Sequence, residues 1–217
     1  MFVGHFAVAL AAKRVEPKLT LPVLFAAVQF LDILWPLFIV LGVEHARIVP
    51  GITAVVPFDL YDFAYSHSLL MSLVWSVLFA LPWLLRGERR AGLVAGACVF
   101  SHFILDWVTH RPDMPLAPGV DMRFGLGLWH HLVLALTVEG AMFAGGIALY
   151  VAATRATNRM GSIGMWCLFA FLVIGWLSTP FGPPPPSIQA VAVSALVLVP
   201  LILLWGHGVE RGRVSRG

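Results

Sequence analysis

The chain has 217 residues, of which 59% are hydrophobic and 12% charged, with a formal net charge of +3 and a mean hydropathy of +0.89. A soluble domain is usually about one quarter charged, so this composition argues against a water-soluble globular protein. The two cysteines, Cys98 and Cys167, lie within apolar runs and support neither a disulfide framework nor a cysteine-based zinc site.

Apolar segments long enough to cross a bilayer, which takes about 20 residues, follow one another along the chain. The first apolar run, residues 2–13, is short, and basic residues follow it, whereas in a secretory signal they would precede it. Six further runs predict full spans at residues 19–42, 66–86, 91–110, 127–153, 160–180 and 187–206. We therefore expect an all-α polytopic membrane bundle, with about six full spans plus a short N-terminal helix in a single domain, 1–217.

The basic residues predict how the bundle is oriented. If Met1 lies outside, the outer loops hold three basic residues, Arg47, Arg111 and Arg123. The inner loops then hold the other eleven, Lys13, Arg14, Lys18, Arg86, Arg89, Arg90, Arg155, Arg159, Arg211, Arg213 and Arg216. The positive-inside rule thus predicts a bacterial inner-membrane protein with its N-terminus outside and its C-terminus in the cytoplasm. Since the positive charge is explained by topology, we expect no nucleic-acid partner.

Ionisable side chains within the predicted spans gather toward the outer side. His5 begins the short helix, Asp32 lies in the outer half of its span, and His67 lies at the outer mouth of the next. His102 and Asp106 are one helical turn apart in the outer half of the following span. Such groups usually face the bundle interior and mark a functional site, because each costs about 2.5–3.5 kcal/mol in lipid. We expect these five residues to meet in one pocket.

Imidazoles and carboxylates together are typical of a divalent metal site. Zn²⁺ is the first expectation for this ligand set, with Mn²⁺ or Fe²⁺ as alternatives, and the lack of a thiolate argues against a closed structural zinc site. His102 and Asp106 can both bind the ion, or one can orient the other. The expected metal-site half is residues 1–145, and the spans within 160–206 are interpreted as scaffold.

Four motifs match, in order and spacing, a family of bacterial membrane proteins. They are GHFAVAL at 4–10, FLDILWP at 30–36, SHSLLMSL at 66–73 and SHFILDWVTHRPDMPL at 101–116. With them the chain resembles the LexA-regulated inner-membrane proteins described as metal-dependent hydrolases, the YdjM type. This family is in turn similar to zinc-dependent phospholipase C and the single-strand nucleases. The resemblance implies a metal-dependent hydrolase in which the family's motif positions are held by His5, Asp32, His67, His102 and Asp106, with Thr109 after the aspartate.

The chain departs from the family pattern at two places. Many relatives read Pro-Asp-hydrophobic-Asp where residues 31–34 read Leu-Asp-Ile-Leu, so one carboxylate is missing. Many also carry a His-Arg pair where this chain has Asp62 and Phe63. Asp62 can replace that imidazole as a ligand.

A hydrolytic mechanism follows as a hypothesis. A metal would activate water and polarise a phosphoryl or carbonyl oxygen. Asp62 or Asp59 is the candidate general base, and Arg111 can hold a phosphate bidentately or pair with Asp113 instead. A pocket in the outer leaflet favours a phosphoester of a lipid or lipid-linked substrate, with the lipid bilayer as the other partner.

Two other classes of protein stay open. A haem or quinone protein could use His67 with His102, or His102 with His130, as axial ligands, but the accompanying carboxylates argue against it. A metal or proton transporter would normally need ionisable groups along a path to both faces, and the inner half here is bare. A serine hydrolase built on Ser66 or Ser68 is disfavoured, since neighbours in sequence rarely align as nucleophile and base. The segment 43–65 is long enough to fold over the pocket, and the sequence does not predict an oligomeric state.

Overall fold

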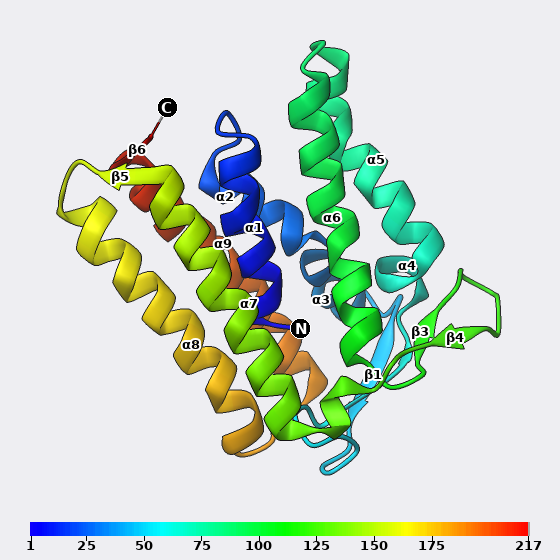
Figure 1. Cartoon of the computed structure of the whole chain (residues 1–217). Coiled ribbons are helices and arrows are strands. Elements are labelled where there is room, and N and C mark those ends of the chain that lie inside the picture. The colour runs from blue at the N-terminus through cyan, green and yellow to red at the C-terminus, as the bar shows by residue number, and fades with distance from the viewer. Residues whose placement is uncertain (217) are drawn as a thin grey trace.

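The structure, a computed structural model, describes residues 1–216 and consists mainly of helices, with three short two-stranded pairs (Figure 1). The helices are α1 (Val3–Val15), α2 (Leu21–Val28), α3 (Phe30–Val40), α4 (Ala64–His67), α5 (Leu69–Leu85), α6 (Arg89–Thr109), α7 (Leu132–Ala153), α8 (Met165–Phe181) and α9 (Ile188–Arg211), with short turns η1 (Leu128–His130) and η2 (Met160–Gly164). The antiparallel pairs are β1 (His45–Ile48) with β2 (Phe58–Asp62), β3 (Met114–Pro115) with β4 (Arg123–Phe124), and β5 (Thr154–Ala156) with β6 (Arg213–Ser215). The all-α prediction is confirmed.

The number of spans differs from the prediction. Within residues 1–216, four helical segments are long and apolar enough to cross a membrane, and the bent pair α2–α3 makes a fifth if it counts as one span. The prediction of about six full spans is therefore not confirmed. The expected span 66–86 is shorter because Ser68 has an extended backbone (ψ 156°), which separates the single turn α4 from α5. The 17 residues of α5 rise about 25 Å, less than the ~30 Å of a hydrocarbon core.

The expected span 19–42 is two helices, which meet at Gln29 with a bend of 57°. A helix end leaves its last carbonyl groups without partners in the helix. Here the carbonyl of Val28 accepts a hydrogen bond from Nδ1 of His102 at 2.6 Å. The break also places Asp32 in the first turn of α3. The segment predicted as one straight span is therefore bent, and the bend places the Val28 carbonyl and Asp32 next to His102.

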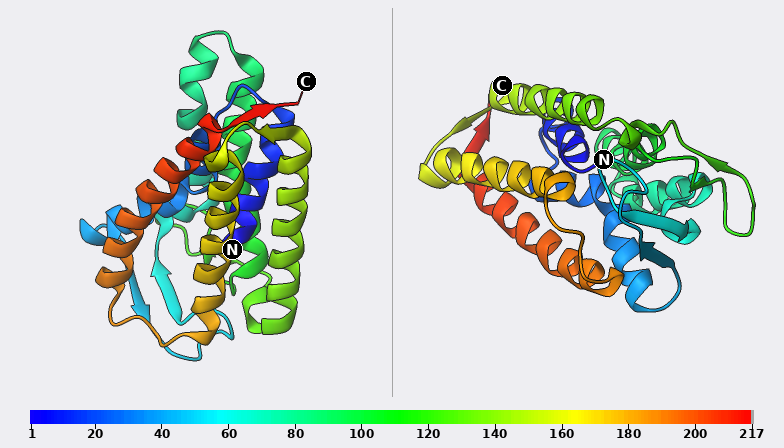
Figure 2. Two further views of the ribbon diagram at one scale, coloured as in Figure 1. Left: turned by 90° about the vertical axis from the view of Figure 1, so that its left-hand side faces the viewer. Right: turned by 90° about the horizontal axis from the view of Figure 1, so that it is seen from below.

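The short helix α1 lies inside the bundle, packed against α2, α6 and α7 (Figure 2). It approaches α7 closely at Gly146, where an added Cβ would lie 2.7 Å from the Cα of Ala7. His5, Phe6 and Leu10 are all buried. Neighbouring helices, not lipid, surround α1, so its 13 residues need not span a bilayer by themselves.

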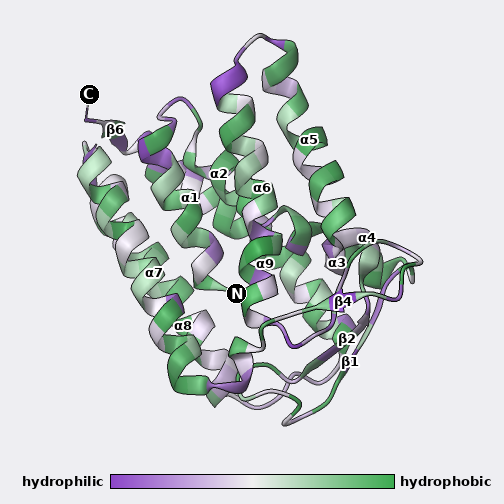
Figure 3. Cartoon of the chain, turned by 45° about the vertical axis from the view of Figure 1, so that its right-hand side comes forward, coloured by the Kyte–Doolittle hydropathy of each residue, from purple (hydrophilic) through white to green (hydrophobic). Residues whose placement is uncertain are grey.

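The two ends of the bundle carry different structures. The β1–β2 and β3–β4 hairpins lie at one end, and the α1–α2 turn, the α5–α6 turn and the β5–β6 pair lie at the other (Figure 1). The helix bodies are mostly apolar, whereas polar residues gather at the turns (Figure 3). The segment between α3 and α4, expected to fold over the pocket, forms the β1–β2 hairpin.

Candidate metal centre

Four imidazoles converge on one buried carboxylate, that of Asp106 on α6. Its Oδ1 atom lies 3.2 Å from Nε2 of His5. Its Oδ2 atom lies 3.1 Å from Nε2 of His102 and 3.9 Å from Nε2 of both His67 and His110. None of the five residues is more than 4% exposed. Every imidazole therefore presents the same ring nitrogen to the same acid.

Asp32 adds a second carboxylate from α3. Its two oxygens lie 3.5 Å from Nε2 of His67 and 3.7 Å from Nε2 of His102. All five residues expected to bind metal are thus brought together, from α1, α3, α4 and α6. Potential ligand atoms lie within 4.8 Å of one another in two groups, His5 with His102 and Asp106, and Asp32 with His67 and His102. The two groups share His102, and because a ring nitrogen offers one lone pair, His102 can bind an ion in only one of them through that atom.

The Nδ1 atoms of three rings are engaged away from the acid. The partner of His102 is the carbonyl of Val28, that of His67 is Oγ of Ser66 at 2.7 Å, and that of His110 is Oδ1 of Asp113 at 3.0 Å. A carbonyl only accepts, so Nδ1 of His102 carries the proton, and Nε2 of the neutral ring has a lone pair. The helix break and the turn after α6 therefore set how these rings point.

At His102 the cluster leaves an acceptor atom facing other acceptors. Among the described residues, Nε2 of His102 is buried without a hydrogen-bond partner although it faces two carboxylates. The His5 ring stacks on the His102 ring at 3.8 Å between centroids, which directs both Nε2 atoms toward Asp106. A buried polar atom without a partner is destabilising, and a cation between Nε2 of His102 and the two carboxylates would satisfy this atom. The donor set therefore fits a divalent metal.

The first residues of the chain also touch the site. The amino nitrogen of Met1 donates to Oδ1 of Asp106 at 2.6 Å, so an ammonium group already pairs with this carboxylate. The backbone N–H of Phe2 donates to Oε2 of Glu139 at 2.9 Å. Glu139, which lies near the middle of the predicted span 127–153, is 1% exposed and holds the start of α1 against α7.

Sequence reasoning missed Glu44, a buried carboxylate between α3 and β1. It accepts hydrogen bonds from the backbone N–H of Ser66 at 2.7 Å and from its hydroxyl at 2.6 Å. Burial raises the pKa of the Glu44 carboxyl, and the hydrogen bonds from Ser66 oppose the rise. No motif marks this residue, because its role depends on a loop that folds back onto α4.

A cavity of about 190 Å³ opens beside the cluster. Its polar side is formed by Asp32, His67, Asp106 and His110, and its aromatic side by Trp35, Phe58, Phe63 and Trp129. The segment between α3 and α4 thus covers the cavity through Phe58 and Phe63. The scaffold spans also contribute, since Thr179 of α8 reaches the lining.

The three residues predicted to be catalytic lie outside this lining. Asp59 pairs with Arg111 and with Arg47, the latter at 2.6 Å. Asp62 pairs with His45 at 2.7 Å. Among residues 1–216, those that line the cavity do not include Asp59, Asp62 or Arg111. Arg111, predicted to hold a phosphate or to pair with Asp113, is engaged by two carboxylates, that of Asp59 and that of Asp113 at 3.0 Å, so the pairing with Asp113 is confirmed.

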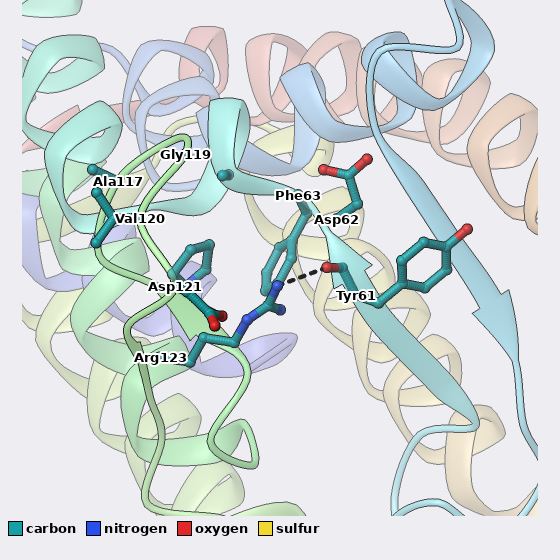
Figure 4. Close-up of a pocket in the computed structure, with 10 residues that line it drawn as sticks. Tyr61, Asp62, Phe63, Ala117, Gly119, Val120, Asp121 and Arg123 are labelled. Atoms are coloured by element: carbon teal, nitrogen blue, oxygen red, sulfur yellow. Dashed lines mark hydrogen bonds between the residues drawn. The ribbon is translucent and has the colours of Figure 1, made fainter.

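A second cavity of about 240 Å³ lies between β2 and the β3–β4 hairpin (Figure 4). Arg123 donates to the carbonyl of Tyr61 across it at 3.0 Å. Asp62 and Asp121 belong to its lining, and imidazoles are absent from the described residues that form it. Phe63 lines both cavities and lies between them. The second cavity therefore offers no comparable ligand set.

No protein-family model matches the chain, and no curated protein or solved structure that we compared with it does either.

Proposed function

We propose that this protein is a membrane-embedded, metal-dependent hydrolase that acts on a phosphoester of a lipid or lipid-linked substrate. The observation that carries the proposal is the convergence of four imidazole Nε2 atoms on Asp106, with Asp32 beside them. A divalent ion, with Zn²⁺ the first candidate, would be held by His5, Asp32, His67, His102 and Asp106. Its charge would add to that of the Met1 amino group in offsetting the carboxylate of Asp106, which is buried, and that of Asp32, which is partly exposed.

When bound, such an ion supplies a water activated near neutral pH and polarises the ester oxygen. The chain itself contributes a group that can hold a proton. His110 lines the cavity with Nε2 directed toward Asp106, and Asp113 holds its Nδ1. This pairing resembles the histidine–carboxylate arrangement of general bases, in which the acid fixes the ring tautomer. The proposal assigns the base to His110 in place of Asp59 or Asp62, whose carboxylates are paired elsewhere.

The choice of substrate rests on the two unlike sides of the cavity. The acidic and imidazole side suits a phosphoryl group near a metal, and the aromatic side suits the first carbons of an apolar chain. A volume of about 190 Å³ holds a headgroup and not a long acyl chain, so the rest of the lipid would stay in the bilayer. The eleven-to-three distribution of basic residues supports a site on the outer, periplasmic side of the bacterial inner membrane.

The geometry favours this proposal over a haem protein. His67 and His102 direct Nε2 at the same carboxylates, and their ring centroids are 5.2 Å apart. Two axial ligands would need to face each other across a porphyrin. A transporter is also disfavoured, because Phe6, Leu10 and Phe25 belong to a packed apolar cluster next to the site.

The test is metal analysis followed by hydrolysis assays on protein purified without chelator or histidine tag. We expect about one or more equivalents of a divalent metal, and release of phosphate from phosphatidic acid or a polyprenyl diphosphate in detergent micelles. Chelation should abolish the activity and Zn²⁺ should restore it. Pure protein that contains no metal and binds none would refute the proposal, and a visible haem spectrum would replace it with the redox alternative.

A further inference from the structure

The strongest feature outside the ligand set is a chain of buried hydrogen bonds that ends on His67. It begins at Glu44, which is 1% exposed, and continues through Ser66, which is fully buried. Ser66 gives both its backbone N–H and its hydroxyl to Glu44, one to each carboxylate oxygen. The Ser66 hydroxyl oxygen lies 2.7 Å from Nδ1 of His67.

The protons in this chain can be counted. Both oxygens of Glu44 receive a proton from a donor, so the carboxylate acts only as an acceptor. The single hydroxyl proton of Ser66 is therefore given to Glu44. Nδ1 of His67 must then donate to the hydroxyl oxygen, and the lone pair of the neutral ring lies on Nε2. That atom faces Asp32 at 3.5 Å and Asp106 at 3.9 Å.

We propose that Glu44 and Ser66 are positioning residues, which hold His67 in the tautomer and orientation that allow Nε2 to bind the metal. The inference rests on the proposed function, since it assigns a role to residues behind one metal ligand. Partners of this kind commonly change metal affinity by 10- to 100-fold when they are removed. His102 and His110 are anchored in the same manner, through Val28 and Asp113.

A catalytic role for Ser66 does not fit the same geometry. A nucleophile must reach the substrate, whereas Ser66 is fully buried, and the described residues that line the cavity do not include it. Its proton is directed to Glu44 and away from the imidazole that would have to accept it. The pair therefore supports a ligand and does not attack a substrate.

Glu44→Gln makes the sharpest test because it keeps the shape of the side chain and reverses which groups donate along the hydrogen-bond chain. The amide oxygen can still accept from the N–H of Ser66, and the amide NH₂ then donates to the hydroxyl oxygen. Ser66 would in turn donate to Nδ1 of His67, which moves the ring proton to Nε2 and blocks the metal bond. We expect Glu44→Gln and Ser66→Ala each to weaken Co²⁺ or Zn²⁺ binding about 10- to 100-fold. Ser66→Thr retains the hydroxyl and should restore the affinity.

Ser68→Ala provides a matched control next to the same histidine. Ser68 is also fully buried, but its hydroxyl caps α5 by accepting from the N–H of Met71 at 3.2 Å. Its removal should lower the melting temperature without changing metal affinity.

Two measurements on the full-length protein in nanodiscs separate the outcomes. The first is ¹⁵N NMR of labelled histidine in metal-free protein, with His67 assigned from His67→Gln, which reports the tautomer directly. We expect Nδ1–H in the wild type and Nε2–H in Glu44→Gln. The second is Co²⁺ titration, in which the visible bands report ligand geometry. If the wild type binds metal and Glu44→Gln keeps both the tautomer of His67 and a metal affinity within threefold of the wild type, this inference is wrong but the proposed function is not refuted. A wild type that binds no metal refutes the proposed function instead.

Discussion

His102→Ala is the substitution for which the metal proposal and a packing role make the most different predictions. His102 is the residue shared by both groups of potential ligands, and its Nε2 is a buried atom without a hydrogen-bond partner among the residues described. A protein zinc site binds with about 10–16 kcal/mol shared among four ligands, or about 2.5–4 kcal/mol per ligand. Each 1.4 kcal/mol is a factor of ten. Loss of His102 should therefore weaken metal binding by about two to three orders of magnitude.

The assay is competition for Zn²⁺ against a chromophoric chelator, with the melting temperature measured on the same metal-free samples. Thr109→Val is the matched control, since Thr109 is also fully buried on α6 and its hydroxyl donates to the backbone carbonyl of Leu105 at 3.1 Å. We expect this control to bind Zn²⁺ within threefold of the wild type. If His102→Ala melts earlier but keeps its Zn²⁺ affinity, the cluster holds helices together and the metal proposal is wrong.

Three further predictions follow from the same geometry. Asp106→Asn keeps the shape of the side chain but removes the charge that four imidazoles face. Since an interaction with a charged group contributes about 1.5–3 kcal/mol, chelator competition should show roughly 10- to 150-fold weaker Zn²⁺ binding. Gly145→Ala and Gly146→Ala should have opposite effects on the melting temperature. At Gly145 an added Cβ meets no atom within 4 Å, and the better helix propensity of alanine should raise the free energy of unfolding by up to about 1 kcal/mol. At Gly146 the Cβ meets the backbone of α1 at 2.7 Å, and overpacking should lower the free energy of unfolding by about 1–3 kcal/mol. In a cysteine-free background, Val120→Cys should react with an impermeant maleimide from the periplasmic side and Arg86→Cys should not; labelling of Arg86→Cys alone would invert the orientation.

The sequence determined the class of fold and most of the candidate site. Long apolar runs can only be helices in a bilayer, because every backbone polar group must be satisfied within its own segment. Ionisable residues inside such runs are expensive unless they meet, so their presence predicted the cluster. His5, Asp32, His67, His102 and Asp106 were identified in this way and lie together in the structure.

The number and shape of the spans could not be predicted from hydropathy. The break at Gln29 joins two apolar helices, so a hydropathy profile sees one segment there. The extended backbone at Ser68 likewise separates α4 from α5 within a continuous apolar run. A profile averages over residues and does not register a change in backbone direction.

Only the tertiary structure decided what lies behind the ligands. Glu44 is 22 residues from Ser66, Val28 is 74 residues from His102, and each contact exists because a loop or a helix end folds onto another element. The same folding paired Asp59 and Asp62 with basic residues and left His110 on the cavity. The residue types in the sequence indicate which groups need partners, since a buried charge or imidazole needs one in any fold. Which partner each group finds depends on distances between segments far apart in the chain, and these are set by packing.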